Sequence, residues 1–363
     1  MKQVKVLMLV LTVLLMAAAC TAIRPEAEDQ GKAAATTPAV EKTAESTGTV
    51  EQKPVENAVD LSKIKANENG QVMILMYHGI GTKEEEWART SDNFRKDLEV
   101  LYDKGYRLIP LKDFIENDIK VEAGYTPVVL TFDDGLENQF KYIEENGVKK
   151  IDPDCAIGIL EDFYKKHPDF GRAASFYVYY PIPFRQKELI KEKFDFLVSN
   201  GYEIGNHAYT HENLGKLDAA GVQKALGLNV KNTQTYLPGY DVFSLALPYG
   251  AAPKGDDFKY AASGEFEGTK YNHRAILKVG SNPALAPNDI KFDPLRLPRV
   301  RASEMKTDGV GMYDWLKYFD KHPEKKYISD GNPKTIAVPE TEVNNVDKDK
   351  LKDKELVTYT AEK

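Results

Sequence analysis

Apolar and polar positions follow one another along the chain in blocks that predict strands and helices in turn. Residues 72–77 and 126–132 are continuous apolar runs, which is typical of strands buried on both faces of a sheet. Residues 92–104 instead carry apolar side chains at helical spacing. The predicted strands are 72–77, 106–111, 126–132, 173–180, 202–206 and 242–248, and the predicted helices are 92–104, 111–117, 156–166, 184–199 and 219–237. Strands that alternate with helices predict an α/β fold with a parallel sheet or barrel.

The N-terminal part of the chain lacks this alternation and has the features of an export signal. Lys2 and Lys5 precede an uncharged apolar run over residues 6–19, which is shorter than the roughly 20 residues of a membrane span. We therefore predict a signal peptide over residues 1–19. The small residues before Cys20 resemble the lipobox of bacterial lipoproteins, so we expect Cys20 to carry a lipid. Ordinary cleavage with release of the protein, and a retained anchor, are the alternatives.

The rest of the chain divides into three segments by composition. Residues 20–65 are rich in Ala, Thr, Glu, Lys and Pro and are predicted to form a flexible tether behind the lipid. Residues 66–335, about 270 in number, are predicted to form one folded domain with an insertion at residues 136–172, a length that suits a single barrel. Residues 336–363 carry charges of both signs and are predicted to form a solvated, charged tail.

The overall composition excludes several classes of function. A net charge of −7 argues against a nucleic-acid binder, which usually presents a basic face. A mean hydropathy of −0.47 excludes a polytopic membrane protein. With 2 cysteines in 363 residues, neither a disulfide scaffold nor a Cys-rich zinc module fits. Cys155 is expected to be a buried small apolar residue, with a reactive thiol as the alternative.

Two groups of polar residues directly follow predicted strands and carry the candidate chemistry. Asp133 and Asp134 directly follow the apolar run of residues 126–132. Two adjacent carboxylates repel each other and need a compensating cation or a proton. His207 and His211 follow the strand at 202–206. Either group alone is more often structural than functional. Together they offer one carboxylate and two imidazoles for a metal ion with open positions, and they leave a second Asp free as a general base.

These groups resemble motifs of the NodB-type polysaccharide deacetylases, carbohydrate esterase family 4. Residues 72–78 and 94–111 also resemble the opening of the poly-N-acetylglucosamine deacetylase branch of this family. The motif Thr-Phe-Asp-Asp-Gly is complete at residues 131–135. The motif His-Ser/Thr-x-x-His matches at residues 207–211, except that Ala208 replaces the hydroxyl residue that normally braces this loop. The motif Arg-x-Pro-Tyr-Gly matches at residues 246–250, with Ala246 in place of the arginine. The resemblance spans about residues 71–301.

The resemblance implies a distorted (β/α)7 barrel with a single catalytic domain and a divalent metal ion, first of all Zn²⁺. Asp134, His207 and His211 would bind this ion, and Asp133 would deprotonate water. The backbone N–H of Tyr249 would help to hold the oxyanion. The implied reaction is N-deacetylation of a GlcNAc-containing extracellular or cell-wall polysaccharide, which yields acetate and a free amino sugar.

Two departures from the family pattern leave roles to be filled. For the missing arginine beside the base, Arg299 or Arg301 is a candidate from a later strand, with a surface position as the alternative. The late Leu-His motif that supplies the general acid has no counterpart. His78 ends the first strand and is our candidate for the acid or for a substrate contact, ahead of His273.

Further residues are expected to contact a sugar chain. Trp87 follows the first strand and is a candidate sugar platform, although core packing is the more common role of aromatic residues. Pro248 and Arg299 are the other predicted substrate contacts.

The predicted partner is an acetylated polysaccharide, with no nucleic acid and with membrane contact only through the N-terminal lipid. The predicted location is extracytoplasmic, anchored by lipid to the bacterial cell membrane, or alternatively secreted. Two other functions stay open: a catalytically weak glycan-binding lipoprotein of the same fold, and an O-acetyl esterase on a xylan-like glycan. A non-haem iron oxygenase shares the two-His, one-carboxylate set but usually has a double-stranded β fold, which the strand–helix alternation argues against.

Overall fold

The computed structural model describes residues 59–361. The predicted signal peptide, Cys20 and the first part of the predicted tether lie outside these residues. Among the described residues, no helix combines the length and the apolar character needed to span a membrane.

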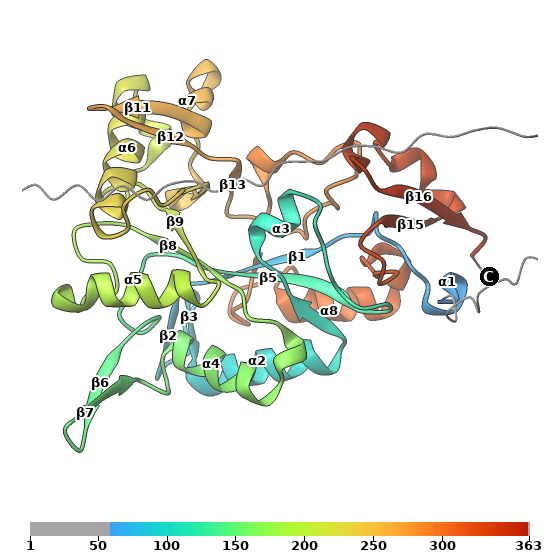
Figure 1. Cartoon of the computed structure of the whole chain (residues 1–363), viewed down its shortest axis with the longest axis horizontal. Helices are drawn as coiled ribbons and strands as arrows, with labels where there is room; N and C mark the ends of the chain where they lie inside the picture. The colour runs from blue at the N-terminus through green and yellow to red at the C-terminus, as the bar shows by residue number, and fades with distance from the viewer. Residues whose placement is uncertain (1–58, 362–363) are drawn as a thin grey trace, which may run out of the picture. The chain divides into compact units, whose positions relative to one another are not determined.

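The centre of the fold is a sheet whose neighbouring strands all run parallel (Figure 1). Its strand order is β13-β10-β9-β8-β5-β1-β14, and β4 pairs with the first half of β5. These strands are β1 (Met73–Tyr77), β4 (Tyr106–Leu108), β5 (Thr126–Phe132), β8 (Ser175–Val178), β9 (Glu203–Asn206), β10 (Ser244–Ala246), β13 (Ala275–Leu277) and β14 (Val300–Arg301). The predicted α/β class and parallel sheet are therefore confirmed.

The two outer strands of this order are joined by the segment that leads into β14. The N–H of Lys278 donates to the carbonyl of Leu297 at 2.9 Å, and the N–H of Leu297 donates to the carbonyl of Ile276 at 2.9 Å. Three residues later, Val300 pairs with Leu75 of β1. Seven parallel strands thus close on themselves through a short bridge, which is the distorted (β/α)7 barrel that the sequence predicted.

Side-chain alternation along the strands separates the barrel interior from the helical layer. On β5, Leu130 and Phe132 point into the cluster shared with the helices, whereas Val129 belongs to the interior cluster. Phe132 stacks on Phe176 of β8 with ring centroids 4.9 Å apart. Because successive side chains of a strand face opposite sides, Thr131 and then Asp133 fall on the interior face with Val129.

Helices cover the outside of the barrel, and most of them match the predicted ranges. They are α2 (Ser91–Asp103), α3 (Leu111–Ile115), α4 (Ala156–Lys166), α5 (Ile190–Ser199), α6 (Ala219–Tyr236), α7 (Lys259–Ala262) and α8 (Met312–Lys321). The predicted helix at 184–199 is wrong in its first six residues. Phe184 and Arg185 have left-handed backbone angles after Pro183, so the regular helix begins only at Ile190.

Two antiparallel hairpins were not predicted. β6 (Tyr142–Glu145) and β7 (Val148–Ile151) lie in the predicted insertion, and β11 (Ser263–Phe266) and β12 (Thr269–Asn272) precede β13. The first hairpin turns at Asn146-Gly147, whose φ angles are 53° and 77°. An Asn-Gly pair with positive φ at both positions is a strong hairpin signal that the sequence did contain. A further short pair joins β2 (Gly79–Gly81) to β3 (Ala88–Thr90).

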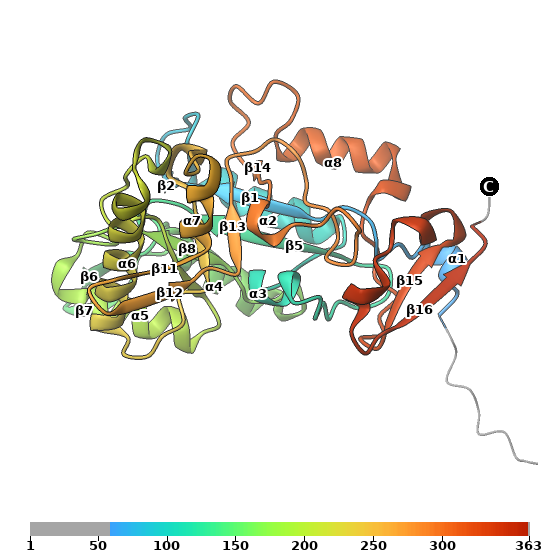
Figure 2. The same cartoon turned by 90° about the horizontal axis from the view of Figure 1, so that it is seen from above.

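The C-terminal segment differs from the predicted charged tail. β15 (Thr335–Pro339) and β16 (Glu355–Tyr359) form a parallel pair that lies beside α1 (Leu61–Ile64) in both cartoon views (Figures 1 and 2). Ile336 and Val338 are fully buried in a small cluster of their own. Apolar residues spaced between the charges therefore give this segment a core, and α1 shows that regular structure begins within the predicted tether.

Glu68 connects this C-terminal pair to the start of β1. Its Oε2 accepts from the N–H of Ala337 at 2.8 Å, and its own N–H donates to the carbonyl of Ala337 at 2.8 Å. The hydroxyl of Tyr327 donates to Oε1 at 3.2 Å. Burial, followed by the nearby charge of Asp330, raises the pKa of Glu68 to about 7.

The raised pKa of Glu68 predicts a specific pH dependence of stability. Because the folded protein holds this proton more tightly than the unfolded chain, the contribution of Glu68 is fully present below pH 4.5. It is lost as the pH rises to about 7, at a cost of about 3 kcal/mol. Glu68→Gln removes this titration, so the free energy of unfolding of the variant minus that of wild type should be more positive at pH 8 than at pH 5, as measured by urea denaturation. Glu355→Gln, an exposed glutamate on β16, is the matched control. Equal pH slopes for the two variants would contradict this account.

Candidate metal centre

The predicted site residues gather where the parallel strands end. Asp133 and Asp134 directly follow β5, and the loop of His207 to His211 directly follows β9. β8 lies between these strands in the sheet. The two loops approach each other across the end of β8 because the chain turns sharply at Gly135, where φ is 56°. A Cβ on Gly135 would lie 3.1 Å from Val178 Cγ1, so a side chain there would push the loops apart.

Asp134, His207 and His211 form a group with three convergent ligand atoms. One potential ligand atom from each residue lies within 4.8 Å of the others. Oδ1 of Asp134 is 3.5 Å from Nε2 of His207 and 3.4 Å from Nε2 of His211. Among the described residues this is the group of His, Cys, Asp or Glu side chains suited to hold a metal ion. The sequence prediction of these three residues as one set thus agrees with where the structure places them.

The histidine and aspartate states in this group fit a metal ion. Nδ1 of His207 lies 2.8 Å from the carbonyl oxygen of Ala246, so Nδ1–H donates to that oxygen and Nε2 keeps its lone pair for a metal. Burial alone would raise the pKa of Asp134, but without a metal ion a protonated His207 outweighs it through its hydrogen bond and charge and lowers that pKa. A metal ion at Nε2 of His207 would take the place of this proton. An ionised carboxylate and an oriented imidazole are what a divalent ion such as Zn²⁺ requires.

Two of the three residues are held in a left-handed backbone conformation. The φ angle is 78° at Asp134 and 59° at His211. Residues other than glycine rarely adopt this conformation, and it costs about 1–3 kcal/mol for each residue. Such strain is typical of functional sites, where the surrounding structure holds side chains in positions that local preferences would not give.

Asp133 is buried inside the barrel mouth and is paired with Arg299. Oδ1 and Oδ2 of Asp133 each accept from one terminal nitrogen of Arg299 at 2.7 Å, and Arg299 also donates from Nε to the carbonyl of Lys278 at 2.9 Å. Burial would raise the pKa of Asp133, but Arg299 and His207 lower it well below the usual range. Asp133 is therefore an ionised carboxylate at neutral pH.

Arg299, rather than Arg301, fills the position left by Ala246. Its side chain is 0% exposed, so a surface position is wrong for this residue. The burial also places it behind Asp133 and gives it no surface for the substrate contact that we predicted. Arg301 instead pairs with Glu86 at 3.1 Å and lies over the Trp87 ring.

His78 lies on the same rim, close to Asp133. Its Nε2 is 3.9 Å from Oδ2 of Asp133, and its ring contacts that of Trp87 with centroids 5.0 Å apart. Burial lowers the pKa of His78 despite the nearby charge of Asp133, so the imidazole is neutral at pH 7. Gln139, which the sequence analysis missed, donates to the backbone carbonyls of His78 and Asp133 and ties the two strand ends together.

The remaining predicted residues differ in exposure. Tyr249 has a φ of 58°, is 67% exposed, and lies with its ring centroid 4.6 Å from that of His211. Trp87 is 43% exposed, so Tyr249 and Trp87 each offer part of a ring to a ligand. Pro248 is buried, and its substrate contact stays a prediction. His273 is buried against the carbonyl of Ala261 at 2.7 Å, which removes it as a candidate acid.

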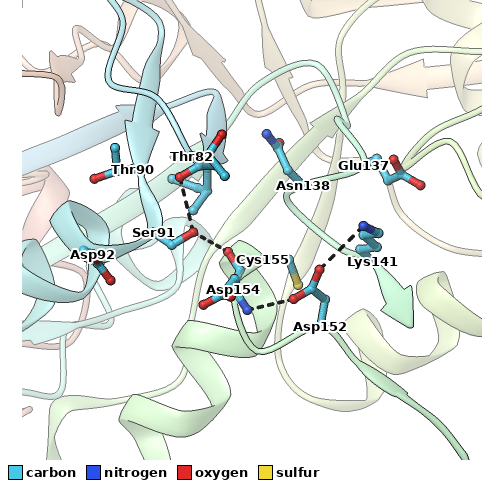
Figure 3. Close-up of a pocket in the computed structure, with 12 residues that line it drawn as sticks. Thr82, Thr90, Ser91, Asp92, Glu137, Asn138, Lys141, Asp152, Asp154 and Cys155 are labelled. Atoms are coloured by element: carbon cyan, nitrogen blue, oxygen red, sulfur yellow. Dashed lines mark hydrogen bonds and ion pairs between the residues drawn. The ribbon is translucent and has the colours of Figure 1, made fainter. Parts of the chain in front are cut away.

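A cavity of about 600 Å³ lies along the same edge of the sheet. One wall is formed by residues 80–82 and 137–141, which follow β1 and β5. Figure 3 shows this wall facing the start of α2 and the turn before α4. Cys155 lies on its floor as a buried thiol that accepts from the N–H of Gly158 at 3.4 Å, as expected of a structural cysteine. The metal-centre residues do not line this cavity.

The similarity of this chain to known proteins is low. No family model and no curated protein match the chain. Among solved structures, the chain is similar to the Streptococcus pyogenes deacetylase PplD in complex with acetate, with 18% identity, a TM-score of 0.49, and coverage of 68% of this chain and 97% of that one. It is also similar to IcaB from Ammonifex degensii, with 15% identity, a TM-score of 0.43, and coverage of 69% and 99%.

A de-N-acetylase from Aggregatibacter actinomycetemcomitans is a third similar structure, with 14% identity, a TM-score of 0.44, and coverage of 68% and 99%. Because each of these TM-scores is below 0.5, we take the fold from the strand order and the function from the geometry of the site.

Removal of one ligand should abolish metal binding. We expect wild-type protein to retain one divalent ion per chain after dialysis, and Asp134→Ala or His207→Ala to retain none, because the remaining two atoms hold an ion too weakly. Elemental analysis of the purified proteins measures this. Glu137→Ala, an exposed carboxylate three residues from Asp134, is the control and should keep the ion. Unchanged metal content in the two ligand variants would remove the assignment.

Proposed function

We propose that this protein is a metal-dependent N-deacetylase that releases acetate from a GlcNAc-containing extracellular or cell-wall polysaccharide. The observation that carries the proposal is the pairing of two adjacent carboxylates with different surroundings. Asp134 faces two imidazoles at 3.4–3.5 Å, whereas Asp133 is fixed by two hydrogen bonds to a buried arginine. One carboxylate is suited to hold a cation and the other to accept a proton.

Asp134, His207 and His211 would hold the ion, with Zn²⁺ the best fit to two imidazoles and one carboxylate. When bound, a divalent ion supplies Lewis acidity toward the amide carbonyl and lowers the pKa of water. Asp133 is ionised and oriented by Arg299, so it can take the proton of the attacking water. Tyr249 would present its backbone N–H to the oxyanion.

His78 is the candidate side chain for returning a proton to the departing amine. Because its imidazole is neutral at rest, it would first take up the proton that Asp133 accepts from water. Its Nε2 lies 3.9 Å from the carboxylate that collects the proton, and its ring is on the open rim of the barrel. Trp87 contacts His78 and is partly exposed, so a sugar ring held against it would lie next to this imidazole.

Arg299, which takes the place of the missing motif arginine, argues against the alternative of a catalytically weak glycan binder. That alternative was motivated by Ala246 and by the absent late histidine. Arg299 supplies the charge beside Asp133 from the segment just before β14, which supports catalysis. An O-acetyl esterase would use the same groups, and the substrate comparison below separates it.

Acetate release from N-acetylglucosamine oligomers tests the proposal. We expect the zinc-loaded protein to release acetate, and Asp133→Asn to lower the rate by about 100-fold or more while it keeps its metal. Acetylated xylan, assayed in parallel, should be a poorer substrate. Equal acetate release by wild type and Asp133→Asn, with oligomer binding intact, would favour the glycan-binding alternative. A preference for acetylated xylan would favour the esterase.

We further propose that the enzyme works outside the cytoplasm, held to the cell membrane by a lipid on Cys20. The support is the charged start, the apolar run and the small residues before Cys20. Cys20→Ser should move the protein from the membrane fraction to the medium, as measured by immunoblotting of both fractions. An unchanged distribution would contradict the lipid anchor.

A further inference from the structure

The loop that carries both histidines lacks its expected side-chain brace but is tightly held. Ala208, at the position of the usual hydroxyl residue, is fully buried and has a φ of 57°. His211 at the end of the loop has a φ of 59°. Two left-handed residues within four positions would relax unless neighbouring groups held them. Some other part of the chain must therefore supply the missing brace.

Two buried amides bind the backbone of this loop on both sides of Ala208. Oδ1 of Asn206 accepts from the N–H of Ala208 at 2.9 Å. Nδ2 of Asn229, on helix α6, donates to the carbonyl of Ala208 at 2.7 Å and to the carbonyl of Val178 at 2.8 Å. Both asparagines are 0% exposed. Hydrogen bonds in such a dry environment fix geometry strongly.

Through Val178, Asn229 is connected both to the histidine loop and to the turn that carries Asp134. The carbonyl of Val178 also accepts from the N–H of His207 at 3.2 Å. Gly135, next to Asp134, packs directly on the Val178 side chain. Asn229 thus links the loop of the two histidines to the strand end against which the Asp134 turn is packed.

A second layer of buried groups fixes the orientation of Asn206. Its Nδ2 donates to the carbonyl of Leu226 on α6 at 3.1 Å and lies 3.2 Å from Nε2 of His273. Nδ1 of His273 in turn lies 2.7 Å from the carbonyl of Ala261. With Nδ1–H donating to that carbonyl, Nε2 of His273 can accept from Asn206. The histidine that the sequence offered as a candidate acid therefore acts in this network.

Stability alone does not account for Asn229. Its Oδ1 is buried and accepts no hydrogen bond within the described part of the chain. An unsatisfied buried acceptor costs about 1–3 kcal/mol. Both hydrogen bonds that Asn229 donates end at the metal site, one on the histidine loop at Ala208 and one on the adjoining strand end at Val178. This placement indicates a role in the site that offsets the cost of the unsatisfied oxygen.

We propose that Asn229, together with Asn206, is a positioning residue that replaces the missing hydroxyl and sets the affinity of the site for its metal ion. This inference rests on the metal site of the proposed function. It implies that Ala208 does not loosen the histidine ligands, because the brace has moved from the loop itself to helix α6.

Metal affinity, measured separately from apoprotein stability, tests the inference. Zn²⁺ binding to the full folded protein is measured by competition with a chromophoric chelator, and thermal unfolding is measured on the metal-free protein. Asn229→Ala should weaken Zn²⁺ binding by about 10–100-fold. Asn232→Ala is the matched control on the same helix, since Asn232 donates only to the carbonyl of Leu228. It should leave the Zn²⁺ affinity unchanged.

Each outcome decides the matter. A loss of affinity with an apoprotein midpoint close to that of the control supports the inference. Unchanged affinity, or an affinity loss only in step with a collapse of apoprotein stability, overturns it. If Asn229→Ala does not fold, Asn229→Gln, which keeps the amide but displaces it, is judged by the same criteria, and failure of both to fold also overturns it. Wild-type protein that binds Zn²⁺ but releases no acetate would refute the deacetylase proposal and leave this inference standing.

Discussion

The buried pair of Asp133 and Arg299 is the interaction on which the rest of the site depends. A carboxylate inside the barrel is tolerated only because both of its oxygens accept from one guanidinium at 2.7 Å. Removal of either partner would leave an uncompensated charge in the interior, at a cost of about 3–5 kcal/mol. Arg299 belongs to the segment that bridges β13 at Leu297 and joins β1 through Val300, so the same short segment closes the barrel and fixes the charge of the base.

The alternation of β5 explains how two neighbouring aspartates acquire different properties. Val129, Thr131 and Asp133 face the interior, where Asp133 meets Arg299, whereas the chain reverses its course at Asp134 through a left-handed turn. Asp134 is half-buried and faces the histidine loop across the end of β8. A proton acceptor and a metal ligand thus arise from consecutive residues by geometry alone, because one side chain lies inside the barrel and the other lies on its rim.

Much of this arrangement was accessible from the sequence because it is local. Continuous apolar runs predicted the central strands, and the motifs after them predicted Asp134, His207 and His211 as one set. The partner of Asp133 could be narrowed only to two arginines, since Arg299 lies 166 positions away and only the closure of the barrel brings it into contact. Asn229 was missed for a similar reason: nothing in the pattern of α6 distinguishes an asparagine that faces a loop from one that faces solvent. The β15–β16 pair was missed because the charged residues between the two strands dominate the composition of this segment, although the strands themselves are mostly apolar.

The rate of acetate release by Arg299→Lys, measured together with its metal content, is the most direct test of the central claim that Asp133 is the catalytic base and depends on Arg299. A lysine keeps the positive charge but loses the paired hydrogen bonds that orient the carboxylate, so kcat/KM at pH 7 should fall by about 10-fold or more while the protein keeps its metal ion. Arg296→Lys, at an exposed arginine that pairs with Asp293, is the control and should leave kcat/KM unchanged. Equal kcat/KM in wild type and Arg299→Lys at equal metal content, or the absence of acetate release by wild type, would contradict the account.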